Sequence, residues 1–240
     1  MSGHSKWKNI AHKKEKTDAQ RAKIFTKLSR EIIVAVREGG PDPASNSRLK
    51  DVIAKARAGN VPSDNIRRVI ERAAGGGAGE TYESIRYEGY GPAGVAVIVE
   101  TMTDNRNRTA SEMRHYFDKN GGNLGPSGCV AWSFDPKGVI VMERADRDED
   151  DVMMTALEAG AADFAAEDEV FEIYTAPEDF GAVCETLEKK GYVFLSAQVE
   201  LVPQTYVALT DEEQIKGMQK LLDMLEDNDD VQNVWHNWDE

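Results

Sequence analysis

The spacing of hydrophobic and polar positions divides the chain into a helical first third and a mixed remainder. Apolar residues recur at helical spacing in three stretches, residues 17–38, 46–59 and 61–73. Each stretch places its aliphatic side chains on one stripe and its basic side chains elsewhere, as an amphipathic helix does. The pattern predicts a three-helix domain over residues 1–75.

The length of the break between the second and third of these helices bears on whether they form a helix-turn-helix motif. It runs from Ala58 to Asp64 and is longer than the three- or four-residue turn of a helix-turn-helix motif. Base reading in the major groove is therefore unsupported. Arg67 and Arg68 are candidates to contact bases or backbone, and ordinary solvated helix charge is the alternative for them.

After the glycine-rich residues 75–80, the apolar spacing changes to the period of two that is typical of strands. Residues 82–90 and 95–102 predict an antiparallel pair around a Gly-Pro-Ala-Gly turn. A helix is expected from Asp104 or Asn105 to about Lys119. Arginines near the first turn of that helix make it a second candidate anion contact, with a satisfied helix cap as the alternative.

Residues 138–202 repeat the order strand, helix, strand twice, which matches the ferredoxin-like arrangement. Helices are expected at 149–159 and 177–190, and strands at 138–143, near Phe164, at 171–174 and at 197–201. A helix at 211–227 and a strand at 231–238 are expected to return to the earlier hairpin. The predicted class is α+β: an N-terminal three-helix domain (1–75), a discontinuous α+β domain (81–137 plus 203–240), and an acidic ferredoxin-like insertion (138–202).

Charge is segregated along the chain, although the total of −14 alone argues against a polyanionic partner. Residues 1–75 hold 17 Lys and Arg against 8 Asp and Glu, a balance of +9, whereas residues 76–144 carry −2 and residues 145–240 carry −21. A basic head on acidic domains is typical of a nucleic-acid-binding protein. A two-signed surface for self-association is the alternative.

The first sixteen residues contain five lysines, two histidines and Trp7, and too little aliphatic content to form a core. Lysines suit phosphate, and an indole can stack on a base; a solvated terminus is the alternative. The predicted nucleic-acid-binding residues are His4, Ser5, Lys6, Trp7, Lys8, His12, Lys13, Lys14, Lys16, Lys23, Lys27, Arg30, Arg67, Arg68, Arg106 and Arg108.

Other chemistry is not supported by the residues. Cys129 and Cys184 lie far apart and predict free, buried thiols in a reducing compartment. The acidic run 146–151 lacks the glycine and glutamate of a calcium loop and is better explained as the start of a helix. We expect no enzyme activity, no metal site, no cofactor and no membrane span, and a cytoplasmic location.

Several motifs, in order, resemble the YebC/PmpR family, whose mitochondrial relatives include a translational activator of cytochrome oxidase. The resemblance covers essentially the whole chain and is carried by Ser2-Gly-His-Ser-Lys-Trp7 with His12-Lys13-Lys14, Lys27-Leu-Ser-Arg-Glu-Ile32, Gly39-Gly-Pro-Asp-Pro43, Asn60-Val-Pro-Ser-Asp-Asn-Ile66, Gly91-Pro-Ala-Gly94, Asp104-Asn-Arg-Asn-Arg108 and Gly121-Gly-Asn-Leu-Gly125.

The resemblance implies a three-domain α+β protein acting as a DNA-binding transcriptional regulator. It also implies an alternative, a ribosome-associated translation factor that binds ribosomal or transfer RNA and relieves stalling on proline-rich sequence. A protein-interaction adaptor, with the acidic domains contacting a protein partner, is a third hypothesis. DNA or RNA as target, sequence specificity and oligomeric state stay open at this point.

Overall fold

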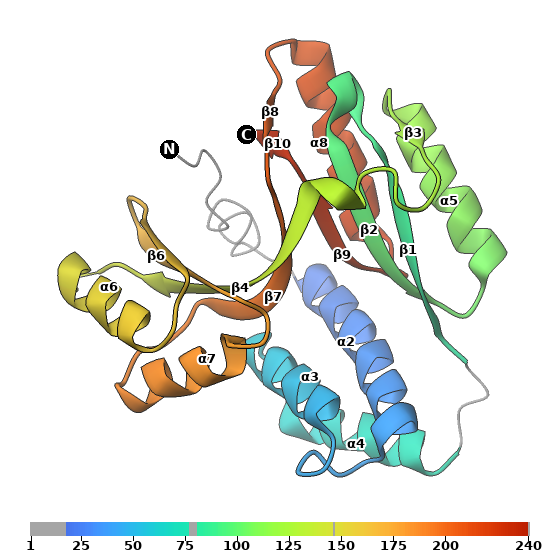
Figure 1. Cartoon of the computed structure of the whole chain (residues 1–240). Coiled ribbons are helices and arrows are strands. Elements are labelled where there is room, and N and C mark those ends of the chain that lie inside the picture. Colours follow the sequence, from blue (N-terminus) through green and yellow to red (C-terminus); the bar gives the residue numbers. More distant parts are fainter. Residues whose placement is uncertain (1–17, 77–80, 146, 240) are drawn as a thin grey trace. The chain divides into compact units, whose positions relative to one another are not determined.

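The computed structural model describes residues 18–76, 81–145 and 147–239 (Figure 1). The described residues form two compact units, one of residues up to 131 together with 209–236, and one of residues 132–208 together with 237–239. Each unit is described below by itself. The α+β class, with a helical region before the sheets, is confirmed. The division into three domains stays a prediction.

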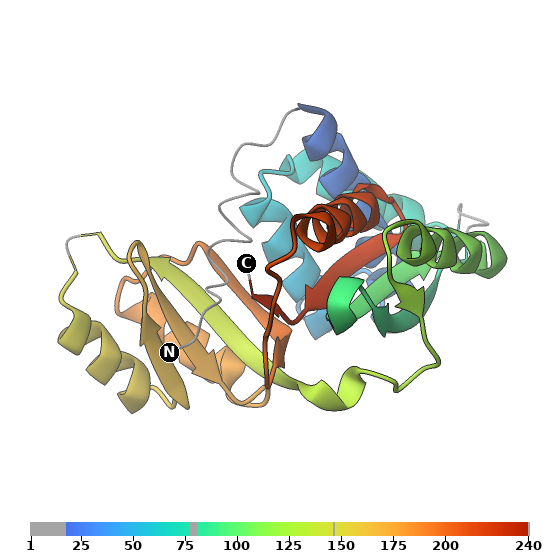
Figure 2. The same ribbon diagram turned by 90° about the horizontal axis from the view of Figure 1, so that it is seen from above.

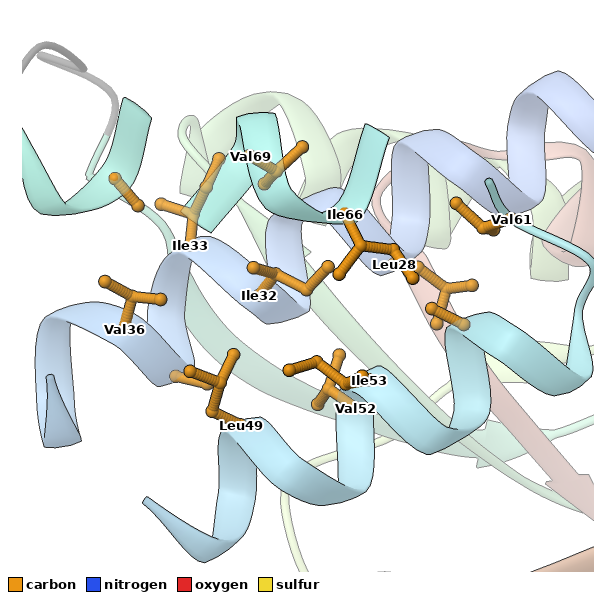
Figure 3. Close-up of a cluster of buried hydrophobic side chains, with 13 residues drawn as sticks. Leu28, Ile32, Ile33, Val36, Leu49, Val52, Ile53, Val61, Ile66 and Val69 are labelled. Carbon is orange, nitrogen blue, oxygen red and sulfur yellow. The ribbon is translucent and has the colours of Figure 1, made fainter. Parts of the chain in front are cut away.

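Three helices open the first unit: α2 (Asp18–Gly39), α3 (Ser47–Ala58) and α4 (Ser63–Ala74). Their aliphatic stripes meet in one core, which Figure 3 shows as side chains converging from all three helices. Asn46 joins the end of α2 to the start of α3. Its Oδ1 accepts the Leu49 N–H at 3.0 Å, and its Nδ2 donates to the carbonyls of Ala35 and Gly40, both at 2.8 Å. The predicted three-helix bundle is confirmed.

The connection between α3 and α4 is shorter than the sequence predicted. It consists of Gly59, Asn60, Val61 and Pro62, because α3 continues to Ala58 and α4 begins at Ser63. Asn60 has a positive φ of 58°, which turns the chain sharply within these four residues. The length of the break therefore does not exclude a helix-turn-helix, and the prediction from its length was wrong.

An antiparallel sheet completes the first unit, in the order β3 (Asn123–Leu124), β1 (Glu83–Tyr90), β2 (Ala96–Thr103) and β9 (Val231–His236). The helices α5 (Arg106–Lys119) and α8 (Glu212–Asp227) cover one face of it (Figures 1 and 2). A Cβ at Gly89 would lie 2.6 Å from the Asn123 carbonyl oxygen and 2.8 Å from the Phe117 ring. Only glycine therefore lets β3 and α5 approach β1 this closely.

The second unit contains the predicted ferredoxin-like order. It consists of β4 (Phe134–Glu143), α6 (Glu149–Glu158), β5 (Asp163–Ala166), β6 (Val170–Thr175), α7 (Phe180–Lys189) and β7 (Ser196–Pro203). The sheet order β5-β6-β4-β7, antiparallel throughout, confirms that arrangement. Asp148 caps α6 by accepting the Asp151 N–H at 3.0 Å, which confirms the helix-start explanation of the acidic run.

The end of the chain differs from the single strand that was expected at 231–238. β9 ends at His236, and Trp238–Asp239 form a separate strand, β10, parallel to β8 (Val207–Ala208) in the second unit. Two 3-10 turns lie at Pro92–Gly94 and Ala131–Ser133. Within the described ranges, no helix combines the length and apolar character needed to cross a membrane.

Candidate nucleic-acid interface

The nine most N-terminal predicted contacts lie outside the described residues, and they stay predictions. They are His4, Ser5, Lys6, Trp7, Lys8, His12, Lys13, Lys14 and Lys16. The remaining seven predicted residues are described, and the structure divides them into cations that bind the protein itself and cations that face outward.

Lys23 and Lys27, on α2, contact the C-terminal end of α8 in the same unit. Lys23 forms an ion pair with the Asp227 carboxylate, and its Nζ also lies 3.3 Å from the Asp227 carbonyl oxygen. The Nζ of Lys27 donates to the Glu226 carbonyl at 2.7 Å. The last carbonyls of a helix carry partial negative charge and attract such cations. The sequence placed both lysines on a solvent-facing side of α2, but the structure uses them to hold α8.

Arg30 also binds the protein itself, and its side chain is only 15% exposed. Its Nη1 lies 2.5 Å from the Asp230 Oδ1, 2.8 Å from the Asp229 carbonyl and 3.1 Å from the Met102 carbonyl. One guanidinium thus joins α2 to the edge where β2 ends and β9 begins. Contact with nucleic acid stays a prediction for Lys23, Lys27 and Arg30, and it would compete with these internal bonds.

Asp230 is the centre of this junction, and the sequence analysis missed it. Its Oδ2 accepts Arg108 Nη2 and Thr109 Oγ1, both at 2.8 Å, and Thr103 Oγ1 at 3.1 Å. Burial alone raises the pKa of this carboxyl, but hydrogen bonds from Arg108, Thr109 and Arg30 outweigh it, and the net pKa is lowered. Asp230 stands in the sequence Asp227-Asn-Asp-Asp230, which has the composition of a surface turn and gives no signal of burial.

The start of α5 is capped, as the alternative explanation expected. Asn105 Oδ1 accepts the Arg108 N–H at 3.1 Å. The Arg108 side chain forms ion pairs with Asp104 and Asp230. Arg106 stays 69% exposed and has only a long 3.8 Å pair with Glu83. Of the two arginines predicted here, Arg106 is the one available to an outside anion.

Helices α3 and α4 of the bundle also carry exposed cations. Arg67 pairs with Asp64 at 3.1 Å and with Glu71 at 3.7 Å, so neighbouring acids partly neutralise it. On α3 and α4, four other exposed cations form no ion pair with the described residues; we call them the outer cation set, Lys50, Arg57, Arg68 and Arg72. Arg68 and Arg72 stand one helical turn apart on α4, and Lys50 and Arg57 two turns apart on α3, so each pair shares one side of its helix. The predicted set included only Arg68 of these four.

Glu88 is a second buried carboxylate that the sequence analysis missed. It is 3% exposed, and it accepts the backbone N–H groups of Gly128, Val130 and Ala131 at 2.9, 3.0 and 2.9 Å. Burial raises the pKa of this carboxyl, and the three backbone hydrogen bonds more than offset that effect, so the net pKa is lowered. Glu88 therefore holds the loop between β3 and β4 against β1.

The described residues contain no group of three or more His, Cys, Asp or Glu arranged to hold a metal ion. Cys129 and Cys184 form no disulfide and are partly rather than fully buried. Burial raises the pKa of both, and that of Cys184 reaches about 11, so neither is an activated thiolate at neutral pH.

Two family models of known proteins match this chain. Residues 82–238 match the family model described as the TACO1/YebC second and third domain, and residues 5–76 match the TACO1/YebC protein N-terminal domain. The chain belongs to the TACO1/YebC family. The family predicted from the sequence motifs is thereby confirmed.

Two relatives of the TACO1/YebC chain carry the name "Probable transcriptional regulatory protein". The one from Acetivibrio thermocellus is 64% identical over 99% of both chains, and the one from Caldicellulosiruptor saccharolyticus is 62% identical over 100% of this chain and 99% of its own. A crystal structure of a conserved hypothetical protein from Aquifex aeolicus is 49% identical, with a TM-score of 0.87 over 98% of this chain and 96% of that one. The names point to regulation rather than to catalysis.

Proposed function

We propose that this TACO1/YebC chain is a nucleic-acid-binding regulator of gene expression, acting as a DNA-binding transcriptional regulator through its basic N-terminal part. The observation that carries the proposal is the outer cation set, four exposed and unpaired cations on the bundle. It supplies positive charge at the end of the chain where the balance is +9. The names of the relatives support the same role.

The position of these charges favours backbone contact over base reading. In a helix-turn-helix, the N-terminal residues of the second helix contact base edges. The first turn of α4 contains Asp64, which pairs with Arg67, whereas Arg68 and Arg72 lie further along the helix. Cations that lie beyond the first turn of α4 suit contact with a phosphate backbone, which both duplex DNA and structured RNA offer. A ribosome-associated translation factor is therefore the second candidate function.

The first test removes two members of the outer cation set. In Arg68→Gln/Arg72→Gln, glutamine keeps the helix propensity while both charges are lost. We expect roughly tenfold weaker binding to a duplex of about 25 base pairs and a salt slope reduced by about 2, since each phosphate contact contributes about 0.9. Lys216→Gln/Lys220→Gln on α8 removes the same charge at the same spacing and should leave binding unchanged. Equal binding by both variants would refute this interface.

The second test separates the two candidate functions. The full-length chain, offered equal concentrations of ribosomes, unrelated duplex and promoter fragments at fixed near-physiological salt, should bind a promoter fragment in preference to the other two. Preferential binding to ribosomes that is weakened by Arg68→Gln/Arg72→Gln would instead establish the translation role. Because affinity for any polyanion depends steeply on salt, all three targets must share one buffer.

A further inference from the structure

The four-stranded sheet of the second unit has two edge strands that differ in length. β5 has four residues and begins at Asp163, whereas β7 has eight residues and, among the described strands, pairs with β4 alone. Proteins protect the edges of sheets with short strands and charged side chains, because unpaired N–H and C=O groups can bind another strand. The longer β7 is therefore the edge at which a further strand can add.

The backbone of β7 bonds to β4 through every second residue. The Gln204 N–H donates to the Ser133 carbonyl at 2.9 Å, in step with the register of the two strands. Because bonded positions alternate along an antiparallel pair, the even-numbered residues of β7 turn their N–H and C=O groups toward β4. Pro203 has no N–H and is odd-numbered, which fits the outward side of an edge strand. The outward backbone groups before it belong to Ala197, Val199 and Leu201.

The side chains of these three residues form an apolar row at the same edge. Val199 lies opposite Gly138 of β4, and a Cβ at Gly138 would lie 2.6 Å from the Phe180 ring of α7. Val199 is therefore on the helix side of the sheet, as are residues two positions away on either side. The helices leave Val199 46% exposed and Ala197 exposed, with Leu201 half-buried. We call Ala197, Val199 and Leu201 the β7 row.

We propose that two copies of this chain associate by antiparallel pairing of their β7 strands about a twofold axis at Val199. Each Val199 then meets its own counterpart, and Ala197 meets the counterpart of Leu201. All three residues of the row turn their N–H and C=O groups outward, so each can donate one hydrogen bond and accept one across the axis. Their side chains form an apolar strip that continues from one copy to the other.

The other face of β7 favours the same register. In pairing about Val199, Gln198 lies opposite the Glu200 of the second copy, so an amide faces a carboxylate. Pairing about Glu200 would instead place two carboxylates directly opposite each other, which is destabilising. The strand is thus complementary to itself on both faces. Because the contact uses the β7 edge of both copies, it closes at a dimer.

The charge of the chain predicts how this association depends on salt. The β7 row carries no charge, whereas each copy has a net charge of −14. Two copies therefore repel each other, and salt that screens the repulsion should strengthen the dimer. A contact between the basic residues 1–75 of one copy and the acidic residues 145–240 of another would weaken in salt. The sign of the salt effect therefore distinguishes the two modes of self-association.

Sedimentation equilibrium of the full-length chain without nucleic acid measures this association. Over a roughly hundredfold range of concentration, we expect a reversible change from the 26.6 kDa of one chain to twice that mass. The dissociation constant should fall severalfold between about 50 mM and about 0.5 M salt. A mass of one chain at every concentration, or a dissociation constant that rises with salt, would overturn the proposal.

Matched lysine variants assign the contact to the β7 row. Val199→Lys places two like charges at the axis and should raise the dissociation constant by about tenfold. Val193→Lys makes the same change at a valine that is 74% exposed and lies outside β7, so it should keep the dimer of the parent chain. Equal constants for the two variants would show that any dimer uses another surface.

A cysteine at the axis tests the register without weakening the pairing. Directly opposite residues have Cα atoms about 5.5 Å apart, which a disulfide can span, so Val199→Cys should give a covalent dimer on oxidation with copper phenanthroline. In Val193→Cys the two new cysteines lie six residues from the axis on opposite sides, on the order of 40 Å apart, and should not cross-link. The parent chain measures the background from Cys129 and Cys184. Equal yields from the two variants would reject the register.

This association goes beyond the proposed function and can fail independently of it. Val199→Lys retains the outer cation set, so a monomeric parent chain that binds duplex would leave the function standing and refute the dimer. A dimer that binds no nucleic acid would do the reverse. A parent chain that stays monomeric but binds an extended peptide at β7, and loses it in Val199→Lys, would assign the edge to a different protein and overturn the second copy as its partner.

Discussion

The two units bury carboxylates in different ways. In the first unit, Asp230 is enclosed by Arg30 and Arg108, and Glu88 accepts three backbone N–H groups. In the second, Glu172 and Glu200 lie on a sheet face, where a tyrosine hydroxyl and a glutamine amide donate to them. The first pair fixes the architecture by ordering a helix junction and a loop. The second pair accepts side-chain rather than backbone donors, within a single sheet.

The largest effect in this comparison is expected from Asp230→Ala. The change leaves Arg30 and Arg108 without their shared carboxylate, and breaking a buried ion pair from one side costs about 3–5 kcal/mol. We expect the free energy of unfolding in urea to fall by about that amount. Asp227→Ala is the control, because the Asp227 side chain is 76% exposed and its pair with Lys23 is worth less than about 1 kcal/mol. Similar losses in both variants would contradict the role of Asp230.

Glu88→Gln should have a smaller effect. An amide has one acceptor oxygen, so its NH2 group would face one of the backbone N–H groups that the carboxylate satisfies. An unsatisfied buried donor costs about 1–3 kcal/mol, and we expect a loss of about 2 kcal/mol in urea together with faster hydrogen exchange at Val130 and Ala131. Glu172→Gln should cost less than Glu88→Gln, since the amide oxygen still accepts the Tyr174 hydroxyl. A loss at Glu172 as large as that at Glu88 would remove the distinction between the two units.

The sequence predicted much of the fold because local patterns determine it. The apolar stripes of the bundle, the period-two strands and the doubled strand-helix-strand order each reflect burial within a few neighbouring residues. Asp148 and Asn105 were also predictable as helix caps, because the cap bond spans only three residues. The α3–α4 turn was misjudged because α3 continues to Ala58 and α4 already begins at Ser63, and periodicity locates helix ends only to within a few residues.

The candidate site was harder to predict because its contacts join residues far apart in the sequence. Arg30 and Asp230 are 200 positions apart, and Lys23 and Asp227 are 204 apart. A helical wheel shows Lys23, Lys27 and Arg30 on a polar face, but it cannot show that the end of α8 lies against that face. Arg68 and Arg72 differ from them because neither forms an ion pair within the part of the chain that the structure describes. Sequence reasoning therefore found the basic region without separating its structural cations from its exposed ones.

The smallest expected effect is a pH dependence that separates Asp230 and Glu88 from ordinary surface carboxylates. The folded pKa of each is lowered below its usual value near 4. Their contribution to stability is therefore fully present above about pH 4 and is lost as the pH falls through the lower folded pKa. Each unit of difference between unfolded and folded pKa is worth about 1.4 kcal/mol.

Urea unfolding at pH 7, 5 and 3 measures this dependence. The stability deficit of Asp230→Ala relative to the parent chain should be the same at pH 7 and pH 5 and smaller at pH 3, because below about pH 4 the unfolded parent chain binds a proton at Asp230 that the folded chain, with its lowered pKa, binds less readily. Asp227→Ala should show no comparable change, because its carboxylate is largely exposed. A deficit for Asp230→Ala that persists undiminished at pH 3 would mean that the ionised carboxylate is not what joins α2 to β9, and that packing around the side chain holds the junction instead.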